Sequence, residues 1–454
     1  MKLRKFNAAT ALGSLTATVA LLAGLSSAHA QAPGAGSYPG SILIPGTNTS
    51  FKVGGYVKGD YVYDFGQQQP RDGGISSPGG LALDNDNGTP GTKPGGGHSI
   101  HGTSQISAAE SRFNIETRTP TGYGELKTYI EGDFTDPNGL THSKTLQLET
   151  NSTGFRLRYA YGTLGPWLVG QYNSVFRDSN SEPETLDFGG EQVAGATRQP
   201  QFRYTYDAGN GLLFAVAAEN PQVQWFDATN LGSTTITTLS TGQGNKIPDF
   251  TGAVTYNAPW GHVAGRAVLR DLYDHNGCGS FNASCSGGTS SVGTQAALNT
   301  FGWGLGVSGD VKTFGKDDFT FQINGGDGIG RYLQNYANVA EFVVGSTVPG
   351  TTNLIHSISG VGGMLSYQHW WTDTLRSTAS GSYVKIFVSD AFAPAFAGLS
   401  PGARQTVTSG LNDTLWISHV NLIWSPVPQV DTGIEFIYSH RRVVDGQTGT
   451  GTRV

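Results

Sequence analysis

Hydrophobic and polar residues alternate one by one along most of this chain. In "ESRFNIETRT", residues 110–119, Phe113 and Ile115 fall on one face, and Arg112, Asn114 and Glu116 fall on the other. This period of two is typical of a β-strand, whose successive side chains point to opposite faces. The same alternation predicts fifteen strands, which begin near residues 51, 111, 125, 155, 167, 201, 212, 249, 262, 301, 318, 358, 374, 414 and 430.

Short and long links between these segments alternate without exception. The short links are "TPTGYG", "LGPW", "DAGNG", "NAPWG", "TFGKDD", "WWTDT" and "SPVPQ". The long links cover residues 66–109, 135–153, 177–199, 220–247, 272–299, 325–356 and 388–411. An antiparallel meander places alternate links at opposite ends, so one rim has tight turns and the other has long loops. Bacterial outer-membrane barrels are built in this way.

Aromatic residues gather beside the short links, as expected of a girdle at a membrane interface. They are Tyr123, Trp167, Trp260, Phe314, Trp370, Trp371 and Trp424. We therefore predict an all-β fold, a transmembrane antiparallel up-and-down β-barrel with its apolar faces toward lipid and its polar faces toward a wide, water-filled lumen.

The predicted barrel covers residues 51–454 and is short by one strand. Single-chain bacterial barrels have even strand numbers, so we expect 16 strands with about 15 of them in this chain. The chain stops at "GTGTRV" without a terminal amphipathic strand. Either one strand escapes the pattern, or the sequence is a fragment whose sixteenth strand begins near Thr452; we favour the fragment.

The N-terminus predicts export. Residues 1–30 carry three basic side chains, an apolar run and a small-residue cleavage site after Ala30, which favours a signal peptide over a membrane anchor. Its removal leaves 25 basic against 34 acidic residues, a net charge of −9, which argues against nucleic acid as a partner. Residues 31–50, rich in Pro and Gly, are predicted to be a flexible segment.

The chain offers little for catalysis or metal binding. "GLGVSG", residues 304–309, has dinucleotide-loop spacing but opens no helix, and no metalloprotease or nucleophile-elbow motif occurs. We expect no enzyme, no cofactor and no metal site. The two cysteines, Cys278 and Cys285, favour a small disulfide loop over free thiols in an exported chain.

The candidate site is the lumen. The basic residues predicted to line it are Arg112, Arg156, Arg158, Arg203, Arg266 and Arg270. The third long link adds the acidic residues Glu182, Glu184, Asp187 and Glu191, which would oppose the arginines if the link folds into the barrel. Such charged constrictions set pore selectivity. A solvated polar surface without selectivity is the alternative.

Several segments resemble the DcaP-like outer-membrane porins of proteobacteria: "SRFNIETRTPTGYGELKTYIEGDF", "FRLRYAYGTLGPWLVGQ", "PETLDFGG", "RQPQFRYTY" and "AVAAENP". The resemblance runs from about Phe51 to Val444. It implies a homotrimer of sixteen-stranded barrels that passes small hydrophilic solutes, with a preference for anions such as dicarboxylates in some members. By resemblance, Arg112, Arg158 and Arg203 belong to a basic lumen wall, and Glu184 and Asp187 to the constriction. The N-terminal coiled coil of some relatives has no counterpart here.

The leading functional hypothesis is therefore a porin in the bacterial outer membrane that lets small hydrophilic solutes diffuse passively. Its expected partners are outer-membrane lipid, these solutes and further copies of the same chain. The alternative is a plugged outer-membrane barrel that acts as an adhesin or structural protein through its long loops. A soluble secreted β-protein is a third possibility, against which the aromatic rim and the alternating links argue.

Overall fold

The computed structural model describes residues 34–66, 102–135, 154–193, 197–227, 239–242, 246–274, 298–333, 342–345, 354–387, 412–444 and 448–454. The strands of its first half are β1 (Ile42–Leu43), β2 (Ser50–Tyr56), β3 (Asp60–Gly66), β4 (Thr103–Ser107), β5 (Arg112–Thr121), β6 (Gly124–Asp133), β7 (Arg156–Leu164), β8 (Trp167–Asn173), β9 (Arg198–Asp207), β10 (Leu212–Glu219), β11 (Val223–Asp227) and β12 (Leu239–Gly242). Those of the second half are β13 (Asp249–Ala258), β14 (Gly261–Asp274), β15 (Leu298–Lys312), β16 (Asp318–Asp327), β17 (Phe342–Gly345), β18 (Leu354–Ser357), β19 (Ser359–Trp370), β20 (Leu375–Ile386), β21 (Asn412–Val427), β22 (Val430–Val443) and β23 (Thr448–Arg453). Two short helices, η2 (Ser179–Ser181) and α3 (Gly330–Leu333), lie in loops.

Nineteen strands form one sheet that closes on itself, because β23 pairs antiparallel with β22 on one side and with β3 on the other. β2 pairs with β5, and β3 pairs with β4. Together β2 and β3 therefore form one strand of the wall with a short interruption, and β4 and β5 form the next one. β1 adds only two residues to β2. The wall therefore has sixteen positions, and each of the fifteen predicted segments coincides with one of them. In the described part of the chain, no helix has both the length and the apolar character to cross a bilayer.

The closing strand corrects the expectation that the sixteenth strand begins near Thr452. β23 begins at Thr448 and pairs with Ile437–Arg442 of β22. Its seam with β3 is held by Arg453, which donates to both carboxylate oxygens of Asp64 at 2.7 and 3.0 Å. The six residues "TGTGTR" contain no apolar side chain, so a search for alternating hydrophobic residues passes over them.

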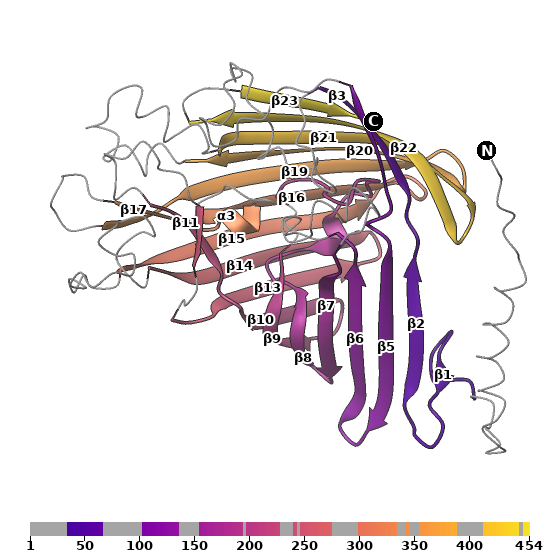
Figure 1. Cartoon of the computed structure of the whole chain (residues 1–454). Coiled ribbons are helices and arrows are strands. Elements are labelled where there is room, and N and C mark those ends of the chain that lie inside the picture. Colours follow the sequence, from indigo (N-terminus) through magenta and orange to yellow (C-terminus); the bar gives the residue numbers. More distant parts are fainter. Residues whose placement is uncertain are drawn as a thin grey trace, which may run out of the picture.

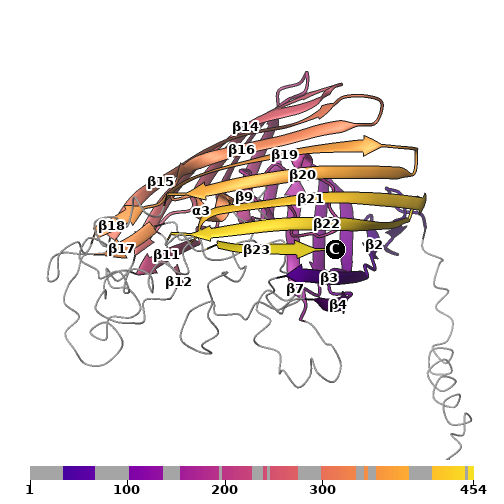
Figure 2. The same cartoon turned by 90° about the horizontal axis from the view of Figure 1, so that it is seen from above.

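The wall has an apolar outer face and a polar inner face. Phe301, Leu305 and Val307 of β15 are 54–60% exposed, whereas Gln322 and Asn324 on the inner face of β16 are buried. A folded chain keeps such an apolar exterior only where lipid covers it. Figure 1 shows the course of the wall, with β2 and β5–β8 running across the direction of β14–β22, and Figure 2 shows the same wall from above.

The antiparallel pairing of neighbouring wall strands places the short turns at one end of the barrel and the strand ends that flank the long links at the other, as the sequence predicts. The small sheet of β11, β12, β17 and β18 and helix α3 lie at the long-loop end (Figures 1 and 2). The predicted interface aromatics are all exposed at or beside short turns: Tyr123, Trp167, Trp260, Trp371 and Trp424. Their contact with the membrane interface stays a prediction.

The described part of the segment before the barrel contacts the wall. Residues 34–49 fold back on the first two wall strands, where the Tyr38 hydroxyl donates to the backbone oxygen of Glu116 at 2.9 Å and Arg118 stacks on the Tyr38 ring at 4.3 Å. Ile42 pairs with Phe51. The flexibility expected of residues 31–50 stays a prediction. The predicted signal peptide, Cys278 and Cys285 lie outside the described residues.

Candidate functional site at the barrel constriction

The segment between β8 and β9 folds into the lumen. Residues 174–193, here called the constriction loop, leave the wall where the backbone nitrogen of Val175 donates to Glu219 at 2.8 Å. The next side chain, Phe176, is buried, and its carbonyl accepts from Arg266 of β14 at 2.5 Å. The loop therefore crosses to strands far along the chain, which answers the question that the sequence left open.

A half-buried carboxylate, Asp178, is the first anchor of the loop on the far wall. It accepts hydrogen bonds from His262 Nε2 at 2.8 Å and from the Ser308 hydroxyl at 2.5 Å. Gln322 donates to the Asp178 backbone oxygen at 3.0 Å. Burial alone would raise the pKa of Asp178, but the hydrogen bonds from His262 and Ser308 outweigh it and lower this pKa to about 2. The anchor is therefore charged at every physiological pH.

Two of the four predicted loop acids form further anchors. Glu184 accepts two hydrogen bonds from Arg376 of β20, at 2.6 and 2.5 Å. Glu191 is 1% exposed and accepts from Ser380 at 2.6 Å and from His419 at 3.0 Å. These carboxylates therefore hold the loop to the wall opposite the arginines.

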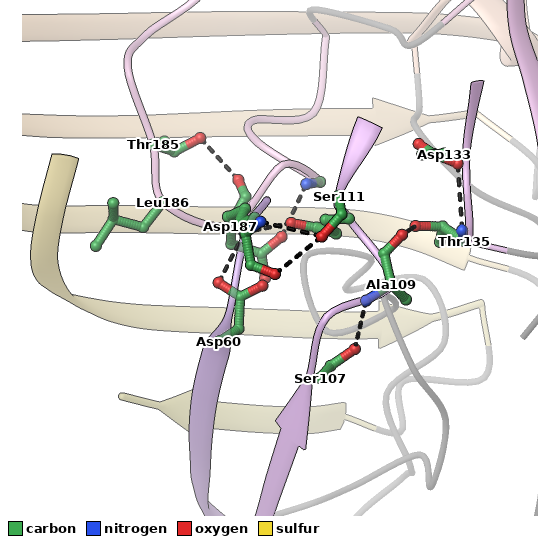
Figure 3. A network of polar contacts seen from close by, with 12 residues as sticks. Asp60, Ser107, Ala109, Ser111, Asp133, Thr135, Thr185, Leu186 and Asp187 are labelled. Atoms are coloured by element: carbon green, nitrogen blue, oxygen red, sulfur yellow. Dashed lines mark hydrogen bonds and ion pairs between the residues drawn. The ribbon is translucent and has the colours of Figure 1, made fainter. Parts of the chain in front are cut away.

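The other two acids lie nearer the tip of the loop. Glu182 is paired within the loop with Arg177, at 2.5 and 2.7 Å. The Asp187 carboxylate lies 3.7 Å from Arg453 of β23. Figure 3 shows this part of the loop beside the first wall strands, with the Thr185 hydroxyl donating to the Asp187 backbone oxygen at 2.8 Å.

A cavity of about 690 Å³ separates the loop from the wall formed by β5–β9. Its basic lining residues are Arg112, Lys127, Arg156, Arg158, Arg177 and Arg198. Its acidic lining residues are Glu110, Asp133, Glu182, Glu184 and Glu191, and four tyrosines, Tyr129, Tyr159, Tyr161 and Tyr172, complete the wall. Three predicted arginines and three predicted acids thus meet at one cavity.

Most of these charges are already paired inside the protein. Asp133 accepts from Arg156 at 2.9 and 2.6 Å and from Arg158 at 2.8 Å, and Arg158 also donates to Glu131 at 3.0 Å. Charge-assisted pairs of this kind hold the guanidinium groups in place along the wall. The two predicted arginines Arg156 and Arg158 therefore shape the cavity while two neighbouring carboxylates offset much of their charge.

Arg198 is the basic residue that stands apart. Within the described chain it forms no hydrogen bond and no ion pair; its guanidinium carbon lies 5.7 Å from the centre of the Tyr159 ring. The charged groups with the strongest influence on it are other cations, Arg158, Arg177 and Arg156. A guanidinium without an acidic partner, beside three more, leaves a positive field that an anion entering the cavity can neutralise.

Sequence reasoning missed Arg198 because of its position in the strand alternation. Counting by twos from Phe202, which is 67% exposed, assigns Arg198 to the lipid-facing side together with Pro200. The side chain nevertheless reaches the cavity, since it lies at the first residue of β9, next to the constriction loop. The two arginines of the segment "RQPQFR" indicate a basic stretch at the start of β9. That Arg198 reaches the cavity can be inferred only once the position of the constriction loop is known.

The tyrosines correct the predicted faces of β7. Alternation counted along β7 from Phe155 and Leu157 assigns Tyr159 and Tyr161 to the apolar side, yet both line the cavity. The pairing of β6 with β7 shifts register between Glu131 and Gly132, so that one extra residue of β7 bulges and the alternation reverses. The Tyr159 hydroxyl then donates to Asn173 at 3.0 Å.

The remaining predicted arginines do not reach this cavity. Arg266 and Arg270 are 4% and 2% exposed, because the loop and the α3 region cover them. Arg270 pairs with Asp249 at 3.0 Å, and Arg203 donates to Gln201 at 2.9 Å and lines a second cavity near the short-turn end. The expectation that Arg266 and Arg270 face an open pore is therefore wrong, although both lie on the inner side of the wall.

Glu110, between β4 and β5, is the acidic lining residue with an unusual protonation equilibrium. Burial, together with the nearby negative charge of Asp187, raises its pKa to about 7, although its ion pair with Lys58 works in the opposite direction. The net charge of the cavity therefore changes near neutral pH.

A closed barrel of sixteen wall positions, an apolar exterior and a loop that narrows a charged lumen together define an outer-membrane porin. The chain belongs to the family described as "Porin subfamily", whose sequence model matches residues 37–440. The protein is thus a channel of the bacterial outer membrane that passes small solutes, and not an enzyme.

Individual relatives agree with this assignment. Porin Omp2a of Brucella suis biovar 1 (strain 1330) is 26% identical over 305 residues, which are 63% of this chain and 72% of the relative. Porin Omp2b of Brucella neotomae is 27% identical over 323 residues, 68% of this chain and 78% of the relative. Among solved structures, the outer membrane channel DcaP of Acinetobacter baumannii has a TM-score of 0.66 at 20% identity, covering 89% of this chain and 95% of that chain. This likeness supports the fold.

Proposed function

We propose that this porin favours anions, small dicarboxylates among them, at the cavity between the constriction loop and the β5–β9 wall. The observation that carries the proposal is Arg198, a cation without an acidic partner in the described chain, surrounded by Arg156, Arg158 and Arg177. A solute with two negative groups gains from several such cations at once, whereas a cation is repelled. The resemblance to DcaP-like porins leads to the same class of solute.

The pairing of the loop acids supports the same direction of selectivity. Arg376 offsets the charge of Glu184, and Arg177 offsets that of Glu182. Paired charges cancel over distances longer than their separation, so they act weakly on a passing ion. Unpaired groups dominate the field in the cavity, and the clearest of them is basic.

The test is the zero-current reversal potential of the purified protein in a planar bilayer under a salt gradient. A potential on the anion side supports the proposal, and a potential on the cation side contradicts it while leaving the channel intact. Absence of conductance from correctly folded protein would instead favour the plugged barrel that acts through its loops.

We also infer that three copies assemble. β7 and β8 have nine and seven residues, compared with sixteen in β21, so the wall is lowest on this side. Phe113, Phe134 and Phe155 form an exposed aromatic cluster there, with ring centres 5.4 and 6.0 Å apart. A second copy would cover such a surface better than lipid alone. Mass measurement of the native protein in detergent tests this: a trimer is expected, and a stable monomer would refute it.

A further inference from the structure

A single aromatic side chain, 42% exposed, borders the cavity on the side of the first wall strands. Phe188, in the constriction loop, lines the cavity together with Arg112. Its ring centre lies 4.2 Å from the Lys58 ammonium nitrogen and 4.7 Å from the Arg112 guanidinium carbon, and Tyr56 meets it edge-on at 6.3 Å. Both distances are within the range of a cation–π contact.

The loop presents Phe188 in a fixed position. The Gly190 backbone nitrogen donates to the Asp187 backbone oxygen at 3.3 Å, and the Gly189 nitrogen donates to the Asp187 carboxylate at 2.8 Å. An aspartate that bonds the backbone two residues on defines a tight turn, here with Phe188 at its tip. Gly190 has φ of 60°, a conformation that glycine adopts without strain.

The base of this turn is attached to β22, which is separated from β3 only by β23. Both carboxylate oxygens of Glu435 in β22 accept backbone hydrogen bonds, from Leu186 and Asp187 at 2.9 Å each. The turn is therefore held from behind by Glu435, while its tip presses the aromatic ring against the cations of the first strands. A side chain held in this way has little freedom to move aside for a solute.

Of the two cations beneath the ring, Lys58 is paired with Asp60 and Glu110, whereas Arg112 is poorly satisfied by hydrogen bonds. The Nε atom of Arg112 is buried and has no hydrogen-bond partner within the described residues, and its nearest acid, Glu131, lies 3.8 Å away. The aromatic ring therefore supplies part of the compensation for this charge. It also stands between Arg112 and the space that a solute would use.

We propose that Phe188 is a specificity-determining residue of the channel. It packs between the constriction loop and the β2–β5 wall and masks the positive charge of Arg112 from the permeating solute, and to a smaller extent that of Lys58, which Asp60 and Glu110 already offset. The width of the pore and the number of cations that a solute meets are then both set by one ring. This role goes beyond the anion preference proposed above, because the effect on pore width does not depend on the sign of selectivity.

The experiment measures single-channel conductance and reversal potential for a series at this position. F188A removes the ring, so we expect conductance to rise by a factor of roughly 1.5 to 2, since the narrowest section widens, and the reversal potential to move toward the anion side. F188W enlarges the ring and should lower conductance. F188L keeps an apolar side chain without a π face, so it should shift selectivity with little change in conductance. F314A, on the exposed short-turn rim, is the matched control and should change neither quantity.

A double variant separates the two effects. In an R112A background, F188A should still raise conductance but should lose much of its shift in reversal potential, because one of the masked charges is absent. Equal conductance in F188A, F188W and the native protein would overturn the inference, and the opposing variants keep it testable if one of them fails to fold. Cation selectivity in the native protein would refute the proposed anion preference yet leave the conductance series valid.

Discussion

Replacement of Arg198 by glutamine should weaken anion selectivity more than any other single change at the wall, because no carboxylate among the described residues pairs with this guanidinium. A solute that reached the position of the cavity-lining Tyr159 ring would lie 5.7 Å from the Arg198 guanidinium carbon. At that separation two unit charges interact by about 0.7 kcal/mol at the dielectric constant of bulk water, and by about 1.5 kcal/mol at half that value. Loss of this attraction should by itself lower the permeability of anions in R198Q roughly three- to twelvefold, and loss of the repulsion of cations should lower the anion-to-cation ratio further.

The assay is the reversal potential in a planar bilayer at about 0.1 M and at about 1 M salt, where the Debye length shrinks from about 10 to about 3 Å. The difference between R198Q and the native channel should be large at low salt and small at high salt. R442Q, which removes an exposed arginine at the other end of the chain, is the matched control. If R198Q and R442Q have the same potential at low salt, Arg198 does not create the field and the reasoning fails.

Three further changes test other parts of the site. The pKa of Glu110 is about 7, so the native channel should become more anion-selective as pH falls from about 8 to about 6, and E110Q should abolish this dependence; a dependence that persists in E110Q points to another group. Because the pKa of Asp178 is lowered to about 2, its contribution to stability is present above the unfolded value near 3.8 and is lost as pH falls toward 2. D178N removes the charged partner of His262 and should increase current noise at neutral pH, and a record as quiet as that of the native channel would contradict this role for the anchor. D249N leaves Arg270 buried without its carboxylate and should lower the free energy of unfolding by about 3–5 kcal/mol in urea titrations followed by tryptophan fluorescence; a loss below about 1 kcal/mol would contradict the buried pair.

The barrel was predictable because lipid imposes a local rule on every strand. An outward residue such as Phe301 or Ile323 must be apolar wherever it lies in the wall, so alternation can be read from each segment alone. The same rule explains the failure at β23, whose Thr and Gly residues satisfy the backbone pairing without any apolar side chain. It also explains the failure at Tyr159, because a bulge of one residue reverses the faces and leaves no mark in composition.

The charge balance of the cavity could not be read in this way, because it depends on partners far apart in the chain. Glu184 and Arg376 are separated by 192 residues, and Glu191 and His419 by 228. Along the chain both acids lie between β8 and β9, which belong to the arginine wall. They reach the opposite side of the barrel only because the loop folds into the lumen. A list of lumen-facing arginines and acids therefore overstates the number that act on a solute.

Selectivity in this channel follows from the charges that the fold leaves without partners. Asp133 offsets Arg156 and Arg158, which keeps these two groups rigid but weakens their field. Arg198 has no such partner, and the charge of Arg112 lies behind the Phe188 ring. A substitution at a paired arginine should thus disturb the shape of the wall, whereas a substitution at Arg198 should change selectivity and leave the wall in place. Reversal potentials of R156Q and R198Q in the same bilayer distinguish the two views. If unpaired charges set the field, R198Q should change selectivity much more than R156Q; if the total number of charges sets it, the two changes should be equal.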